Sequence, residues 1–123
     1  MKSKPTILVV EDDIALNDAY MTILGMKYEN VHAAFNGEEA LHVAAEQNPD
    51  IIFLDLRMPV MDGIGFLEKY LPKENHPDVH IVVFSNYDMQ AEVDKAYELG
   101  AERYVLKAWA SPKELLKIVD DLS

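Results

Sequence analysis

Charged and hydroxyl side chains stand at the ends of several short apolar runs, where they could act together. The acidic group Glu11-Asp12-Asp13 follows the run Thr6-Ile7-Leu8-Val9-Val10, and Asp55, Ser85 and Lys107 come at or just after three later runs. If these runs are parallel strands of one open sheet, their carboxyl ends meet at one edge, where such sheets bind ligands. The sequence therefore predicts a site that combines carboxylates from two strand ends with one hydroxyl and one ammonium group.

Phosphoryl transfer is the chemistry that this combination favours. Crowded carboxylates repel one another and partly protonate unless a cation lies among them. Magnesium prefers one or two carboxylates, several waters and a phosphate oxygen, and Asp12 or Asp13 together with Asp55 fits this preference. A carboxylate can attack a phosphoryl donor while a metal ion and a lysine offset the developing charge. We therefore expect Asp55 to be the nucleophile, Lys107 to offset charge, and the Ser85 hydroxyl to donate to a phosphoryl oxygen.

The segments that must position these residues alternate between strand and helix. Short runs rich in β-branched and apolar residues predict strands over residues 6–10, 31–35, 51–54, 79–84 and 103–106. These runs are mostly apolar and do not alternate strictly with polar residues, as is typical of strands covered on both faces in a parallel sheet. Each is followed by a segment of helix length, so the pattern indicates a doubly wound α/β domain.

Cap residues and helical spacing locate five expected helices. They begin near residues 13, 36, 62, 88 and 111; the second ends at Asn48-Pro49, the third at about Leu71, and the fourth before Gly100. Ser111-Pro112 is a cap followed by a first-turn proline. The residues expected to pack inward from the first, fourth and fifth helices are Leu16, Tyr20, Ile23, Leu24, Val93, Ala96, Tyr97, Leu115, Val119 and Leu122.

Composition limits the class of protein. The chain has 123 residues, of which 50% are hydrophobic, and this predicts one domain over residues 1–123. A formal net charge of −11 disfavours direct nucleic-acid binding, which depends on Lys and Arg. The chain has no cysteine for a disulfide or a thiolate metal site. Because no apolar run approaches the roughly 20 residues that span a bilayer and the start does not resemble a signal peptide, we expect a cytoplasmic protein without a membrane partner.

The chain resembles the receiver domains of two-component response regulators over essentially its whole length. The resemblance lies in Glu11-Asp12-Asp13, in the run from Asp55 to Gly63 with its Met-Pro-Val-Met-Asp-Gly sequence, and in Ser85, Tyr104 and Lys107. It implies a flavodoxin-like, three-layer (βα)5 sandwich whose parallel sheet has the strand order 2-1-3-4-5. The match of chain length to one such domain favours a stand-alone regulator.

The resemblance also implies the roles of the site residues. Asp55 would accept a phosphoryl group from a phosphohistidine on a sensor histidine kinase or a phosphotransfer protein. Magnesium, or manganese, would be held by Asp12, Asp13 and Asp55 and by the backbone carbonyl of Arg57, with Glu11 nearby.

A switch of partner binding follows from the same resemblance. Ser85 would move toward the phosphoryl group while the ring of Tyr104 turns inward, which remodels the face formed by the fourth helix, the fifth strand and the fifth helix. The affinity for an unidentified downstream protein would change, and the protein would be a monomer or a phosphorylation-dependent dimer. It would be a signalling phosphoacceptor that assists its own phosphorylation and dephosphorylation, not an enzyme acting on other substrates.

Two departures from the family pattern, Ala108 and Asn86, lie beside predicted site residues. Ala108 follows Lys107 where the family has a cis proline; because a cis bond before a non-proline residue costs about 2.5–4 kcal/mol, we expect a trans Lys107–Ala108 bond. Trp109 is expected to pack against the last helix, an interpretation that we favour over contact with a partner. Asn86 replaces a small residue beside Ser85 and would narrow access to the pocket.

Two further positions concern the lifetime of a phosphoaspartate. Arg57 and Tyr87 occupy positions that, in the family, flank the path of the hydrolytic water. We therefore expect both to influence dephosphorylation; an unchanged rate in Arg57→Ala and Tyr87→Ala would contradict this.

Other protein classes fit the sequence less well. A phosphohydrolase of the haloacid dehalogenase class needs a second acid two residues after the nucleophile, where this chain has Arg57. A flavodoxin needs hydroxyls and amides in its first loop, where the chain has acids that repel phosphate. The main alternative is a receiver-like protein-interaction module that is not phosphorylated in use, which Ala108 and Asn86 favour.

Overall fold

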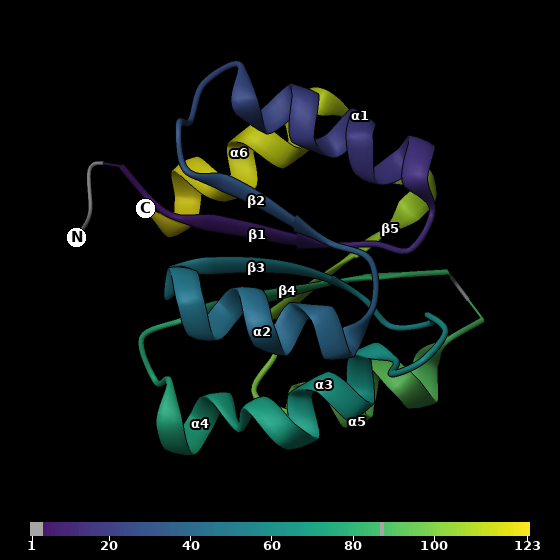
Figure 1. The fold of residues 1–123 in the computed structure, drawn as a ribbon. Coiled ribbons are helices and arrows are strands. Elements are labelled where there is room, and N and C mark those ends of the chain that lie inside the picture. The colour runs from purple at the N-terminus through teal and green to yellow at the C-terminus, as the bar shows by residue number, and fades with distance from the viewer. Residues whose placement is uncertain (1–3, 87) are drawn as a thin grey trace.

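The computed structural model describes residues 4–86 and 88–123, which form one parallel sheet covered by helices on both faces (Figure 1). The five strands lie in the order β2-β1-β3-β4-β5, and every neighbouring pair is parallel. The predicted doubly wound α/β fold and its 2-1-3-4-5 order are therefore confirmed.

The strands begin and end within one residue of the predicted bounds. They are β1 (Ile7–Val10), β2 (Val31–Ala34), β3 (Ile51–Asp55), β4 (His80–Ser85) and β5 (Arg103–Leu106). Their side chains alternate between the two faces of the sheet, so each of the central strands contributes to two separate apolar layers.

The helices include two short elements that the sequence did not predict. The full set is α1 (Ile14–Gly25), α2 (Gly37–Gln47), α3 (Gly63–Tyr70), α4 (Pro72–Asn75), α5 (Gln90–Leu99), the 3₁₀ turn η1 (Lys107–Trp109) and α6 (Pro112–Leu122). The expectation of one helix after each strand is thus wrong after β3. Leu71 adopts a left-handed conformation that ends α3, and Pro72 then starts α4, because a proline fits the first turn of a helix. None of the described helices is both long and apolar enough to cross a membrane.

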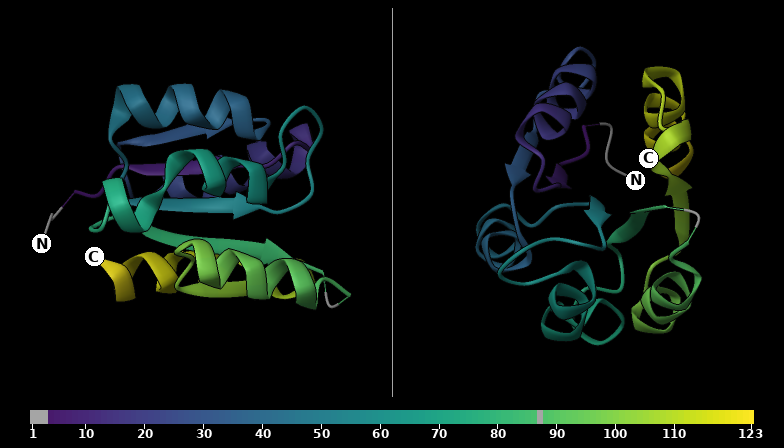
Figure 2. Two further views of the ribbon diagram at one scale, coloured as in Figure 1. Left: turned by 90° about the horizontal axis from the view of Figure 1, so that it is seen from below. Right: turned by 90° about the vertical axis from the view of Figure 1, so that its right-hand side faces the viewer.

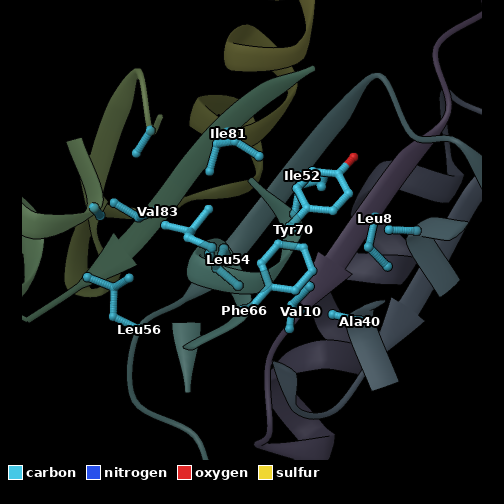
Figure 3. Packing of buried hydrophobic residues seen from close by; sticks show 14 of the residues in the cluster. Leu8, Val10, Ala40, Ile52, Leu54, Leu56, Phe66, Tyr70, Ile81 and Val83 are labelled. Carbon is cyan, nitrogen blue, oxygen red and sulfur yellow. The ribbon is translucent and has the colours of Figure 1, made fainter. Parts of the chain in front are cut away.

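Two apolar layers hold the helices to the sheet. Figure 2 shows α1 and α6 on one face and α2, α3 and α5 on the other. Beneath α2, α3 and α5, strand residues such as Leu8 and Ile52 pack around Phe66 and Tyr70 (Figure 3). Under α1 and α6, the ring of Phe84 stacks on those of Tyr20 and Phe53, with centroid distances of 4.9 and 5.7 Å.

Side-chain caps fix the starts of four helices as predicted. Asp13, Asn36, Asp62 and Ser111 each accept a hydrogen bond from the backbone N–H three residues later, at 2.7–3.2 Å. The fourth expected helix starts later than predicted: α5 begins at Gln90 without a side-chain cap.

The end of α5 depends on a glycine. Gly100 has a φ of 123°, and a Cβ at this position would lie 2.7 Å from Pro72 Cγ. The glycine therefore both ends α5, as predicted, and lets α4 approach it.

Three predictions about packing need correction. Tyr97 is 38% exposed, because its ring lies at the surface edge-on to that of Tyr104, with centroids 6.4 Å apart. Leu122 is only half-buried, and Ile118 takes the inward position instead. Trp109 does not pack against the last helix: it is 74% exposed, because the η1 turn holds it outside the contact between α6 and the sheet.

Candidate functional site

The predicted site residues meet at the carboxyl edge of the sheet. Asp55 ends β3 and Ser85 ends β4, while Glu11 directly follows β1 and Lys107 directly follows β5. The register places Asp55 opposite Phe84, one residue before Ser85, and places Ser85 opposite Leu106, one residue before Lys107. Adjacent parallel strands therefore bring together four residues that lie far apart in the sequence.

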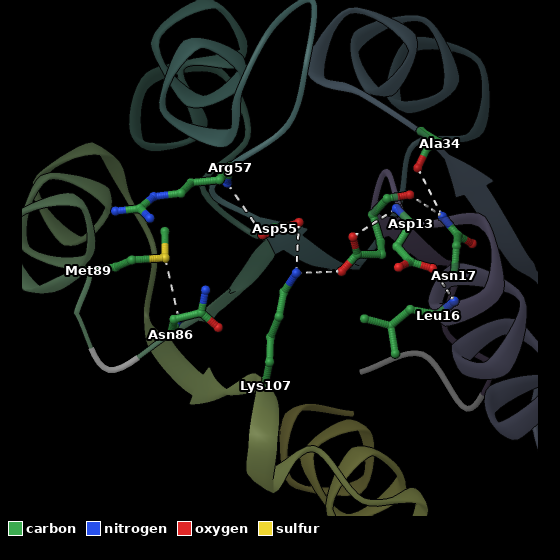
Figure 4. Close-up of polar contacts among 10 residues, drawn as sticks. Asp13, Leu16, Asn17, Ala34, Asp55, Arg57, Asn86, Met89 and Lys107 are labelled. Atoms are coloured by element: carbon green, nitrogen blue, oxygen red, sulfur yellow. Dashed lines mark hydrogen bonds and ion pairs between the residues drawn. The ribbon is translucent and has the colours of Figure 1, made fainter.

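Lys107 connects two buried carboxylates (Figure 4). Its Nζ lies 3.0 Å from Asp55 Oδ2 and 2.9 Å from Glu11 Oε1. Both acids are almost completely excluded from water, and the ammonium group itself is largely covered. Because charges in a poorly solvated site interact more strongly than at the surface, this lysine compensates charge that water cannot reach.

The carboxylates that cluster are those of Glu11, Asp12 and Asp55. One oxygen of each lies within 4.8 Å of the others, and no other group of this kind occurs in residues 4–86 and 88–123. The donor set contains only hard oxygen ligands, without histidine or cysteine, and so fits magnesium or a similar divalent cation. The structure thus offers the side chains of three strand-end acids to a metal ion.

Asp13 stands outside this group, contrary to its expected place beside Asp12. Its Oδ1 accepts a hydrogen bond from Leu16 N at 3.0 Å and caps α1. Glu11 takes the place beside Asp55, and its Oε2 accepts a hydrogen bond from Asp13 N at 3.1 Å. Capping holds the Asp13 carboxylate at the start of the helix, and this is why Asp13 is not among the clustered acids.

Burial changes the ionisation of the pocket. Desolvation raises the pKa of Glu11 to about 7, against the lowering effect of Lys107, and nearby Asp55 adds to the rise. Burial alone would lower the pKa of Lys107, but its contacts with Glu11 and Asp55 outweigh burial and raise that pKa. Lys107 therefore remains charged, whereas Glu11 is protonated more readily than a solvent-exposed glutamate.

The Ser85 hydroxyl is a buried polar group with no hydrogen-bond partner among the described residues. A buried hydroxyl without a partner costs free energy and is uncommon in folded proteins. This hydroxyl can therefore donate a hydrogen bond to an acceptor that a bound ligand supplies.

The remaining predicted residues of the described chain lie after β3, after β4 and in β5. Arg57 N donates to Asp55 Oδ1 at 3.3 Å, whereas its guanidinium contacts Glu92 of α5 at 2.9 Å. Asn86 is exposed, and its backbone N–H donates to the sulfur of the buried Met89 at 3.3 Å. Tyr104 is 46% exposed and lies at the surface.

Two further predictions concern the Lys107–Ala108 bond and Tyr87. The Lys107–Ala108 bond is trans, as predicted, because no cis bond occurs in the described residues. Tyr87 lies outside the described residues, so its expected influence on dephosphorylation stays a prediction.

Two further residues, for which no role was predicted, hold the site loops. Asn17 is buried, and its Nδ2 donates to the carbonyl oxygens of Glu11 and Ala34 at 2.9 and 3.1 Å (Figure 4). The available signal was a polar residue three positions before Tyr20 on the inward face of α1. A Cβ on Gly63 would lie 2.5 Å from the backbone oxygen of Asp55, so only glycine allows the loop after β3 to fold back this closely.

Comparison with known proteins identifies similar chains. The profile of the family described as "Response regulator receiver domain" matches residues 7–120. The probable transcriptional regulator ycf27 of Cyanophora paradoxa is 38% identical over 113 residues, which cover 92% of this chain and 46% of that protein. The chemotaxis protein CheY of Halobacterium salinarum is 29% identical over 95% of this chain and 96% of its own length.

Solved structures agree with this result. The chemotaxis protein CheY4 of Vibrio cholerae superposes with a TM-score of 0.86 at 25% identity, over 98% of this chain and 100% of that one. The chain spans about half the length of several of the probable transcriptional regulators that it matches.

Proposed function

Because the chain belongs to the family of response regulator receiver domains, which act in two-component signalling, we propose that Asp55 is its phosphoryl acceptor. The observation that carries the proposal is the position of Lys107 Nζ, at 2.9 and 3.0 Å from the buried carboxylates of Glu11 and Asp55. An aspartate at a strand end with this compensation is suited to take up a phosphoryl group without accumulating unshielded negative charge. Residues 1–123 are proposed to form one receiver domain.

The proposed reaction is an in-line transfer from a phosphohistidine on a sensor histidine kinase or a phosphotransfer protein. An oxygen of Asp55 attacks the phosphorus, the bond from phosphorus to the histidine nitrogen breaks, and its electron pair stays on that nitrogen. Lys107 keeps its charge and interacts with the oxygens of the transferred group. The product is an aspartyl phosphate beside the unpaired hydroxyl of Ser85.

Glu11, Asp12 and Asp55 would hold the magnesium ion, or manganese, with the Arg57 carbonyl as the expected backbone ligand. When bound, a divalent cation offsets the negative charge of the phosphoryl group and of the acids. Glu11 replaces Asp13 in this proposal, because the Asp13 carboxylate caps α1.

The proposed output is a change in protein binding. Ser85 donates its hydroxyl hydrogen to a phosphoryl oxygen, which gives this buried group the partner that it lacks. Tyr104 then turns inward from its exposed position, and the surface of α5, β5 and α6 changes its affinity for a downstream protein. The protein is proposed to act as a monomer or as a phosphorylation-dependent dimer.

Intact-mass measurement after incubation with phosphoramidate or acetyl phosphate and magnesium tests the acceptor. The wild-type chain is expected to gain one phosphoryl group and Asp55→Asn none. Asp50→Asn is the matched control, because Asp50 lies at the opposite edge of the sheet, just before β3. Absence of any addition in wild type, or an addition that persists in Asp55→Asn, would overturn the proposal.

The second candidate is a receiver-like interaction module that is not phosphorylated in use. The trans Lys107–Ala108 bond favours it, because the family has a cis proline after this lysine. The same measurement separates the candidates, since the interaction module would gain no phosphoryl group under any of these conditions.

A further inference from the structure

A surface groove lies where β5, the η1 turn and the first turn of α6 meet. It has a volume of about 420 Å³ and is lined by Tyr104, Val105, Leu106, Trp109 and Glu114. Its lining combines two aromatic rings, two aliphatic side chains and a single carboxylate. It is separate from the acidic pocket that contains Asp55.

Trp109 is the most unusual part of this groove. It is 74% exposed, although an indole is among the largest apolar groups that a protein can remove from water. The nearby Tyr104 ring is also 46% exposed. The faces of aromatic rings, and of indole above all, attract cations. The groove therefore presents aromatic surface that a cationic side chain can cover.

Glu114 supplies a negative charge in the same groove. Its carboxylate takes part in no ion pair with the described residues. Its backbone N–H donates a hydrogen bond to Ser111 Oγ at 3.2 Å. The cations on neighbouring elements are paired elsewhere: Arg103 and Lys117 both contact Asp121, at 3.8 and 3.2 Å. Lys113 precedes Glu114, but consecutive residues on a helix do not face the same direction. The groove thus offers an uncompensated carboxylate to an incoming positive charge.

We propose that this groove binds an arginine side chain presented by a downstream protein partner. A planar guanidinium can stack on the Trp109 ring and donate hydrogen bonds to the Glu114 carboxylate, a combination that a lysine ammonium cannot make equally well. This inference rests on the proposed function in one respect: Tyr104 lines the groove, so its inward movement on phosphorylation changes the arginine site.

A partner protein fits this groove better than a second copy of the chain. The chain has two arginines, and both are in ion pairs, Arg57 with Glu92 and Arg103 with Asp121. Two copies, each with a net charge of −11, also repel one another. The occupant is therefore a basic segment of another protein.

Trp109 is the only tryptophan of the chain, so its fluorescence reports on this groove alone. The probe is a short acetylated and amidated glycine-serine peptide with two arginines, titrated into the unphosphorylated protein. The control peptide carries citrulline in place of arginine, which keeps the shape but removes the charge. We expect a saturable fluorescence change with the arginine peptide and a dissociation constant at least about threefold higher with the citrulline peptide.

Glu114→Gln and Glu46→Gln form a matched pair of variants. Both remove one negative charge from an exposed helical glutamate, but Glu46 lies on α2, outside the groove. Glu114→Gln should weaken binding of the arginine peptide by about threefold to tenfold, whereas Glu46→Gln should not change it.

Three results would overturn the inference. The first is equal affinity for the arginine and citrulline peptides, and the second is equal weakening of arginine-peptide binding by Glu114→Gln and Glu46→Gln. The third is a fluorescence change that depends on protein concentration alone and accompanies formation of a dimer in sedimentation. Because the titration uses unphosphorylated protein and the acceptor is tested by mass, failure of the arginine site is distinguishable from failure of Asp55 as the acceptor.

Discussion

The two edges of the sheet carry similar residues in different physical states. At the carboxyl edge, Glu11 and Asp55 are buried and share the ammonium group of Lys107. At the amino edge, His80 and Glu102 pair at 2.6 Å, but both side chains are more than a third exposed. An open pocket of about 380 Å³ lies at the amino edge and is lined in part by Asp50 and His80.

The difference lies in how the polar groups are satisfied. At the amino edge, Asp50 Oδ2 accepts a hydrogen bond from Thr6 N at 2.8 Å, which ties the start of β1 to that of β3. At the carboxyl edge, the hydroxyl of Ser85 has no partner in the described chain, and the pKa of Glu11 is raised to about 7 by burial. Asp50 at the amino edge thus stabilises the fold. At the carboxyl edge, a bound cation would offset the charge of the acids, and a phosphoryl group would give the Ser85 hydroxyl a partner.

The largest expected effect follows from removing the central ammonium group. Lys107→Ala should lower the rate of phosphoryl incorporation from phosphoramidate by about 100-fold, equivalent to about 2.7 kcal/mol, because the transferred charge loses its nearest cation. His80→Ala, at the amino edge, should leave this rate unchanged. Incorporation is followed by intact mass over time. A loss below about threefold in Lys107→Ala, or an equal loss in His80→Ala, would remove the contrast between the edges.

A pH dependence of stability is expected from Glu11 in metal-free buffer. Its pKa is raised from 4.5 in the unfolded chain to about 7 in the fold, so the native state binds more protons between these values. The free energy of unfolding should therefore fall as the pH rises from about 4.5 to about 7, by on the order of 2 kcal/mol from this group.

Glu11→Gln isolates that contribution. Urea unfolding across the pH range should show a flatter profile in Glu11→Gln than in wild type, with the variant relatively more stable near pH 7. Added magnesium should reduce the fall in wild type, because the cation favours the ionised acid. Parallel profiles for the two proteins would mean that Glu11 is not responsible.

The smallest expected effects contrast stability with function. Asp50→Ala should lower the free energy of unfolding by about 1 kcal/mol, because Thr6 N loses its acceptor, while phosphoryl incorporation stays normal.

Ser85→Ala should leave stability unchanged or raise it by up to about 1 kcal/mol, because it removes a buried hydroxyl without a partner. Urea unfolding measures the stability of each variant. Binding of the arginine peptide with and without beryllofluoride measures its function. A marked loss of stability in Ser85→Ala would show that its hydroxyl already has a structural partner.

Much of the fold could be predicted because its signals are local. Short β-branched runs gave the strands to within one residue, and four caps located the starts of α1, α2, α3 and α6. The signals failed where tertiary contacts compete with local pattern. Tyr97 has helical spacing with Val93 and Ala96, yet it lies at the surface against Tyr104.

The sequence by itself determined that acids, a hydroxyl and a lysine would stand at the carboxyl ends of neighbouring strands, because apolar runs and their polar ends are visible along the chain. Only the tertiary structure decided which side chains point into the pocket. Glu11 and Asp13 are two residues apart and chemically alike. The Asp13 carboxylate accepts a hydrogen bond from Leu16 N and caps α1, whereas the Glu11 carboxylate pairs with Lys107. Likewise, the exposure of Trp109 depends on the η1 turn, which no local pattern predicted and which connects β5 to α6.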